Sequence, residues 1–267
     1  MNLLTTILVG ALAGAHASTW GMYKDAPHEG FTVPKYLRSL VLAAALAPFV
    51  ATILEIYPGD SASLVILFGC VYAAERAVLE SWKTFFREED QSKYAIPMQL
   101  AVFGRVVKSR PVRVLFGFLY LGAIVGGLIL VSGLRVPPAT PRWLLAVTIG
   151  ALGGWYSAFG GAWKDAPIEG FQIFKFFRSP LIAAGFAYLL YTLGATPAQG
   201  MFGAIGYTVA TTETWKTFFF PSVPRGKFAG KPIRFPEMLR KRQYFVPLYV
   251  AIWILVLAGF ASALAGR

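Results

Sequence analysis

Apolar residues follow one another along this chain in long continuous runs, separated by short polar and charged segments. The runs approach the roughly 20 residues that an α-helix needs to cross the hydrocarbon core of a bilayer. They do not alternate as barrel strands do, so helices must satisfy the backbone polar groups in lipid. We therefore predict an all-α integral membrane protein. Eight spans are expected, at about 3–22, 39–57, 62–82, 113–134, 143–162, 179–194, 200–219 and 245–264.

Composition supports a membrane environment and limits the chemistry. Hydrophobic residues make up 56% of the 267 residues and charged residues only 14%, whereas an ordinary soluble domain carries about 25% charged residues. A single cysteine, Cys70, permits neither an internal disulfide nor a cysteine-based metal cluster. The two histidines, His16 and His28, are too few for a histidine-rich metal site. We predict no metal site, and the sequence specifies no cofactor.

The net charge of +12 has a topological explanation. In a soluble protein it would suggest nucleic acid as the partner. Here most of the 25 basic residues lie in the connections after the first, third, fifth and seventh spans, and basic loops stay in the cytoplasm. We expect a bacterial or archaeal inner (plasma) membrane with both termini outside, although an organelle inner membrane would give the same pattern. Lipid, and not nucleic acid, is the expected partner.

One charged octapeptide occurs twice, as KDAPHEGF at 24–31 and as KDAPIEGF at 164–171. A second pair, ESWKTFF at 80–86 and ETWKTFF at 213–219, follows in the same order. We therefore predict an internal duplication, a tandem repeat of units 1–134 and 135–267. Each unit has four spans, an even number, so both copies enter the membrane in the same direction. A pseudo-two-fold axis along the membrane normal would relate them.

The octapeptides and the residues that follow them supply candidate ligand-binding side chains. Lysine offers a point charge and arginine a bidentate fork, a combination that suits phosphate, and the carboxylates beside them favour a balanced polar network. The alternative is a charged turn held by local ion pairs, and Pro27 predicts that the first span ends near Ala26. The candidates are Lys24, Asp25, Glu29, Lys35 and Arg38 in the first copy, and Lys164, Asp165, Glu169, Lys175 and Arg178 in the second.

Two glutamates complete the candidate site. Glu80 and Glu213 lie near the ends of the third and seventh spans, each followed by a lysine, Lys83 or Lys216. A carboxylate one turn inside the membrane needs a partner or a wet cavity. We expect basic residues of the octapeptide loops to be these partners, in two similar clusters about the axis. The neighbouring tryptophans and lysines are explained equally well as interfacial anchors.

The two predicted copies differ deeper in the membrane. Glu75 and Arg76 lie further inside the third span, where the second copy has Thr208 and Val209. This difference fits one active and one degenerate half, or a local ion pair buried between helices.

Glycines spaced by four residues predict close helix packing. They occur at Gly10 and Gly14, at Gly150 and Gly154, and at Gly122 and Gly126. Because the first two pairs match at an offset of 140 residues, we expect the first and fifth spans to pack near the axis.

Three classes of function fit these features. The basic stretches 103–113 and 225–242 interleave apolar and basic residues, which favours contact with anionic lipid headgroups. We favour a protein that binds or processes a phosphate-bearing lipid or another anionic ligand at its cytoplasmic face. The alternatives are a channel or transporter with a pathway along the repeat axis, and a non-catalytic scaffold or assembly subunit with membrane-protein partners or further copies of itself. The sequence assigns no catalytic residue.

Overall fold

The computed structural model describes residues 2–94, 98–103, 105–223, 225 and 228–266, without the side chains of Lys93, residues 163–169 and Lys175. Long helices dominate these ranges, beside one two-stranded antiparallel hairpin of β1 (Ala101–Val102) and β2 (Arg105–Val106). Within these described ranges, six helical stretches are long and apolar enough to cross a membrane, which identifies an all-α, multi-pass membrane protein. They are Leu3–Glu29, Val33–Ile53, Ser61–Phe86, Arg110–Ser132, Arg142–Ala162 and Met238–Ala265.

The long helices match the predicted spans in order. They are α1 (Leu3–Glu29), α2 (Val33–Ile53), α3 (Ser61–Ser81), α4 (Arg110–Ser132), α6 (Ala151–Glu169), α7 (Ile173–Thr192), α8 (Pro197–Phe218) and α10 (Val246–Ala265). Shorter helical segments extend them or lie in the connections between them: η1 (Trp82–Phe86), η2 (Gln91–Lys93), α5 (Arg142–Leu145), η3 (Ala146–Gly150), α9 (Met238–Lys241) and η5 (Arg242–Phe245). Helices α7 and α8 coincide with the sixth and seventh predicted spans but are not among the six apolar stretches, so a total of eight spans stays a prediction.

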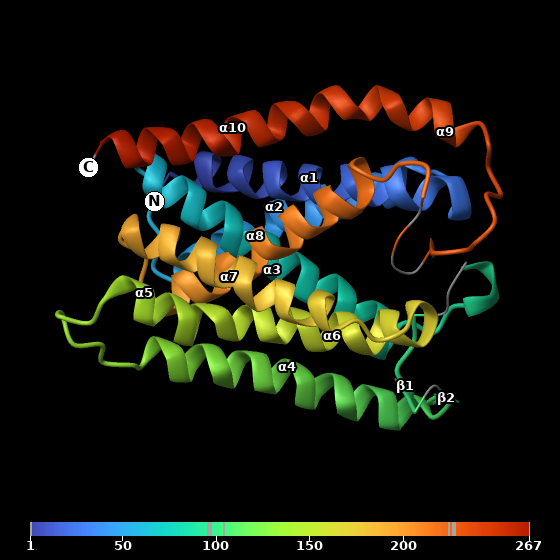
Figure 1. Cartoon of the computed structure of the whole chain (residues 1–267), viewed down its shortest axis with the longest axis horizontal. Coiled ribbons are helices and arrows are strands. Elements are labelled where there is room, and N and C mark those ends of the chain that lie inside the picture. The colour runs from blue at the N-terminus through green and yellow to red at the C-terminus, as the bar shows by residue number, and fades with distance from the viewer. Residues whose placement is uncertain (1, 95–97, 104, 224, 226–227, 267) are drawn as a thin grey trace.

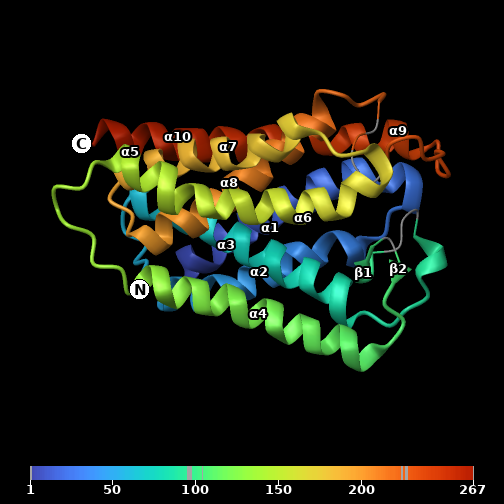
Figure 2. The same ribbon diagram turned by 60° about the horizontal axis from the view of Figure 1, so that its bottom comes forward.

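Helices α3 and α8 form the centre of the bundle (Figures 1 and 2), because glycines let their backbones meet. A Cβ on Gly206 would run into the backbone carbonyl of Gly69. The α1–α2 hairpin packs on α3, the α6–α7 hairpin packs on α8, and α10 covers α3 and α1. Helices α1 and α6, the first and fifth predicted spans, pack on this central pair, and their position near a repeat axis stays a prediction.

The two hairpins use glycine in the same way. A Cβ on Gly14 of α1 would collide with the carbonyl of Ser39, and one on Gly154 of α6 with the carbonyl of Ser179. These contacts confirm the predicted close packing for both hairpins. Gly122 and Gly126 of α4 differ, since a Cβ on either would meet nothing within 4 Å among the described residues. Within the described part of the chain, the glycine spacing in α4 therefore marks no close helix contact.

Helix α1 runs through Pro27 and ends at Glu29, where Gly30 adopts a φ of 77°. The predicted end near Ala26 is therefore too early. Proline has no N–H, so the carbonyl of Tyr23 loses its donor within the helix. Arg242 Nη1 donates to that carbonyl at 3.0 Å and replaces the lost hydrogen bond. Gly170, after α6, has a φ of 79° and repeats the same turn.

The connections divide between two ends of the bundle. Figures 1 and 2 show the α1–α2, α3–α4 and α6–α7 connections and the segment after α8 at one end, and both termini at the other. The first end holds most of the basic residues, and we call it the basic end.

Candidate functional site

A cavity of about 1020 Å³ near the basic end brings the predicted site residues together. Ten of the fourteen have described side chains, and all ten line it: Lys24, Asp25, Glu29, Lys35, Arg38, Glu80, Lys83, Arg178, Glu213 and Lys216. Lys164, Asp165, Glu169 and Lys175 lie outside the described side chains. Motifs far apart in the sequence therefore face one shared space.

An ion pair between α1 and α8 forms part of one wall of the cavity. Lys24 Nζ donates to Glu213 Oε2 at 2.7 Å, and Lys216 Nζ lies 3.7 Å from the other oxygen, Glu213 Oε1. The side chains of Lys24 and Glu213 are only 16% and 15% exposed. An octapeptide lysine is thus a partner of Glu213, as predicted, and it joins the first predicted unit to the second.

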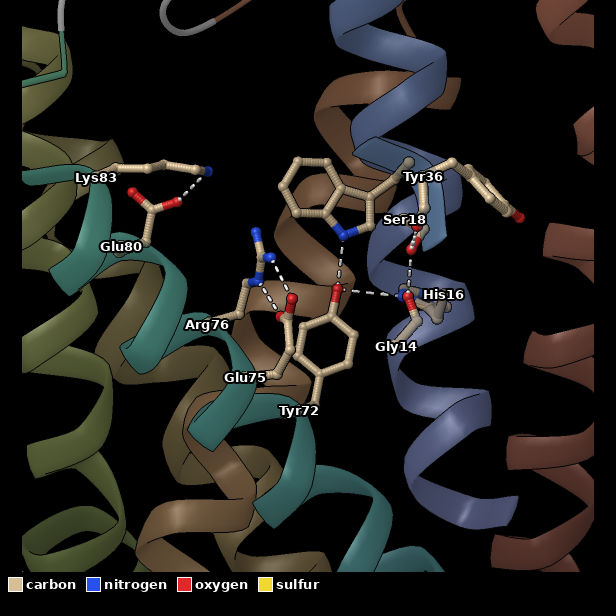
Figure 3. Close-up of polar contacts among 10 residues, drawn as sticks. Gly14, His16, Ser18, Tyr36, Tyr72, Glu75, Arg76, Glu80 and Lys83 are labelled. Carbon is tan, nitrogen blue, oxygen red and sulfur yellow. Dashed lines mark hydrogen bonds and ion pairs between the residues drawn. The ribbon is translucent and has the colours of Figure 1, made fainter. Parts of the chain in front are cut away.

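The other wall carries a local ion pair at the end of α3. Lys83 Nζ, in the π-helical turn η1, donates to Glu80 Oε1 at 3.1 Å (Figure 3). Trp82 and Trp215 are 55% and 47% exposed, which fits the predicted role of tryptophan as an interfacial anchor. The lysines and glutamates turn towards the cavity while the tryptophans face outwards.

Glu75 and Arg76 form a bidentate ion pair deeper in α3 (Figure 3). Arg76 Nη2 donates to Glu75 Oε1 at 2.7 Å, and Nε donates to the second carboxylate oxygen. Glu75 is 1% exposed, and Arg76 lines the cavity. At the matching positions of α8, Val209 lines the cavity and the Thr208 hydroxyl donates to Ala204 O at 2.7 Å. The two halves of the cavity therefore differ chemically at depth.

Sequence reasoning missed a polar group beside this pair. Trp20 Nε1 donates to the Tyr72 hydroxyl at 2.6 Å, and that hydroxyl lies 3.2 Å from His16 Nδ1 (Figure 3). Lys24 Nζ and Arg76 Cζ lie 4.5 and 5.5 Å from the Trp20 ring centroid, within cation–π range. The spacing of four residues from His16 to Trp20 to Lys24 was the available signal, because it places all three on one helix face.

A second, smaller hollow of about 580 Å³ continues the cavity sideways. We call it the side branch, and its lining is Tyr120, Tyr156, Phe159, Gly160, Ala162, Phe171 and Phe176. All of these except Phe159 also line the main cavity, so the two spaces adjoin. Phe159 and Phe171 are 62% and 59% exposed. The side branch thus leads from the charged cavity, between α4, α6 and the start of α7, towards the outer surface of the bundle.

The charge balance of the cavity favours an anion. Its described lining carries nine basic side chains (Lys24, Lys35, Arg38, Arg76, Lys83, Arg87, Arg178, Lys216 and Arg225) and four acidic ones (Asp25, Glu29, Glu80 and Glu213). Tyr94, in the connection after α3, lies 4.1 Å from Arg87 Cζ and 5.7 Å from Lys35 Nζ, ring centroid to cation. Tyr94 therefore lies against two of the cations that line the cavity.

The chain matches no protein-family model, no curated protein and no solved structure. What the cavity can bind therefore follows from its own residues. It combines an excess of positive charge at one end with an aromatic, side-opening branch at the other.

Proposed function

We propose that this protein binds an anionic amphiphile, most simply a phosphate-bearing lipid, in the cavity at its basic end. The observation that carries the proposal is that the charged cavity and the apolar side branch adjoin and share six lining residues. A head group needs charged and hydrogen-bonding partners, whereas a hydrocarbon chain needs apolar contact, and the two adjoining spaces together offer both. We place the basic end on the cytoplasmic side of a bacterial or archaeal inner membrane, following the distribution of basic residues.

The head group would lie among Lys24, Lys83 and Lys216. Each of these lysines has a glutamate beside it, which keeps the empty cavity from carrying the full repulsion of its cations. An anion that enters the cavity can accept hydrogen bonds from these lysines, either in place of the glutamate carboxylates or together with them. Arg76 is held by Glu75 in a fixed orientation at the inner edge of the cavity, which suits an arginine that recognises phosphate.

We further propose that the site is built from two duplicated four-helix units, 1–134 and 135–267, inserted in the same direction with eight spans in all. Matching contacts at Gly14 and Gly154 support this, as do the matching φ values at Gly30 and Gly170. Helices α3 and α8 also begin alike, each with a reciprocal capping box. Duplication would place both octapeptides at the basic end, facing one ligand.

The two alternatives have less support. A pathway along the repeat axis would have to pass between α3 and α8, where the backbones of Gly69 and Gly206 touch. A scaffold needs packing faces and a charged platform, but it does not need a charged cavity with a side opening to the bilayer. We therefore favour ligand binding over both.

Thermal unfolding of the purified protein with defined lipids tests the proposal. Phosphatidic acid should stabilise the protein, by about 2.7 kcal/mol at a hundredfold excess over Kd, and phosphatidylcholine with identical chains should have little effect. Combining Lys24→Gln with Lys83→Gln should weaken the binding of phosphatidic acid at least tenfold. Arg135→Gln, an exposed change outside the cavity lining, is the control. Equal stabilisation by both lipids, or an unchanged effect in the double variant, would contradict the proposal.

A further inference from the structure

The side branch owes its space to missing side chains on α6. Gly160 lines both the main cavity and the side branch, and Gly161 lines the main cavity. A Cβ on either would meet nothing within 4 Å among the described residues. These glycines therefore do not serve close helix packing, unlike Gly150 and Gly154 earlier on the same segment.

The corresponding place in the first half of the chain is filled. At the offset of 140 residues that relates the octapeptides, Gly160 corresponds to Trp20. Trp20 is 7% exposed and is anchored by its hydrogen bond to the Tyr72 hydroxyl. One half of the chain thus fills this position with an indole ring, and the other half leaves it open.

The walls of the side branch are suited to a hydrocarbon chain. Its lining is aromatic or aliphatic except for the hydroxyls of Tyr120 and Tyr156. These two rings, from α4 and α6, lie 5.6 Å apart between centroids and belong to both spaces, so they mark the junction. At the outer end, Phe159 and Phe171 are exposed on the surface of the bundle. These walls offer apolar contact to a chain attached to a head group in the adjoining charged cavity.

We infer that the side branch holds one hydrocarbon chain of the bound amphiphile, which enters sideways from the bilayer between α4 and α6, and that Gly160 is the specificity-determining position. This inference rests on the proposed function. Only one chain is accommodated in this way, because Trp20 fills the corresponding place in the first half. The ligand class is therefore a membrane lipid with an anionic head group, and a water-soluble head group alone would occupy only the charged cavity.

Photolabelling locates the chain without any change to the protein. The probe is phosphatidic acid that carries a diazirine near the end of one acyl chain, and the labelled peptides are identified by mass spectrometry. We expect the label on α4 and α6, around Tyr120, Tyr156 and Phe159, and we expect unlabelled phosphatidic acid to compete with it. Label spread evenly over the lipid-facing surfaces of α2 and α10 would overturn the inference.

A tryptophan in place of Gly160 copies the first half of the chain and should close the branch. We expect Gly160→Trp to weaken binding of long-chain phosphatidic acid at least tenfold and to leave binding of glycerol 3-phosphate, the head group alone, unchanged. Gly185→Trp is the matched control, because Gly185 is an exposed α7 glycine with nothing within 4 Å of a Cβ among the described residues and lines neither space.

The outcomes separate this inference from the proposed function. If the wild-type protein binds no phosphatidic acid, the proposed function fails and the inference falls with it. If the wild type binds it through the lysines but Gly160→Trp binds as tightly as Gly185→Trp, only the inference fails. If Gly160→Trp does not fold, the photolabelling of the wild type still decides the position of the chain.

Discussion

Single residues at the basic end compensate for groups that the fold would otherwise leave unpaired. Pro27 deprives the Tyr23 carbonyl of its helical donor, and Arg242 supplies a replacement from the segment that follows α8. The same guanidinium donates to the Pro221 carbonyl at 3.0 Å and lies 4.2 Å from the Tyr23 ring centroid. The first octapeptide is therefore fixed in place by a residue more than 200 positions away.

Replacing Arg242 with methionine should lower the free energy of unfolding. Arg242 is 7% exposed, and its removal leaves two backbone carbonyls without this donor. An unsatisfied buried polar group costs about 1–3 kcal/mol. Thermal unfolding in detergent measures the change. Arg240→Met, at an exposed position two residues earlier, should have little effect, and an equal loss in both variants would contradict this role for Arg242.

The ion pair between Lys24 and Glu213 should show energetic coupling. Lys24→Glu and Glu213→Lys each place like charges together at a mostly buried site, so each should destabilise the protein. The double variant restores opposite charges and should recover part of the loss, with a coupling on the order of 1–3 kcal/mol. Strictly additive losses would mean that the contact between α1 and α8 contributes nothing.

At the scale of helices, glycine contacts decide which elements meet. The α3–α8 contact depends on Gly69 and Gly206, and the two hairpins depend on Gly14 and Gly154. Helix α4 packs mainly on η1 and α8 and lies at the lower edge of both overall views (Figures 1 and 2). Its loose association leaves room for the cavity beside α6.

Replacing glycine with alanine distinguishes glycines at a close helix contact from glycines that face open space. Gly206→Ala would push a Cβ into the Gly69 carbonyl, and such overpacking typically costs about 1–3 kcal/mol. Gly126→Ala places the same methyl group in open space among the described residues and should leave the unfolding temperature nearly unchanged. The comparison is read from paired thermal unfolding curves. Similar values for the two variants would refute the assignment of α3 and α8 as the central contact.

The sequence predicts the helical membrane class and ten of the residues that line the cavity, because hydrophobic runs and repeated charged motifs are local patterns. It does not predict how α1 passes Pro27, because the compensating donor, Arg242, is distant in sequence. The glycine spacing in α4 was misleading, since the pattern at Gly122 and Gly126 does not reveal which way that helix faces. The side branch was missed because a cavity is formed by what neighbouring helices leave unfilled.

At the scale of the whole molecule, the gathering of basic connections at one end predicts a fixed orientation. Cys70 is fully buried, so the native chain should react little with a membrane-impermeant maleimide. In intact bacterial cells, Ala139→Cys in the α4–α5 connection should react, and Lys231→Cys at the basic end should react only after lysis. The reverse pattern would overturn the proposed orientation.

The central claim is that the cavity holds an anionic membrane lipid. Native mass spectrometry of the protein, extracted gently from its own membrane, tests this most directly. We predict one tightly bound, phosphate-bearing lipid per chain, retained by the wild type and largely lost when Lys24→Gln and Lys83→Gln are combined. A protein that carries no lipid, or that keeps the same lipids equally well in the double variant, would contradict the claim.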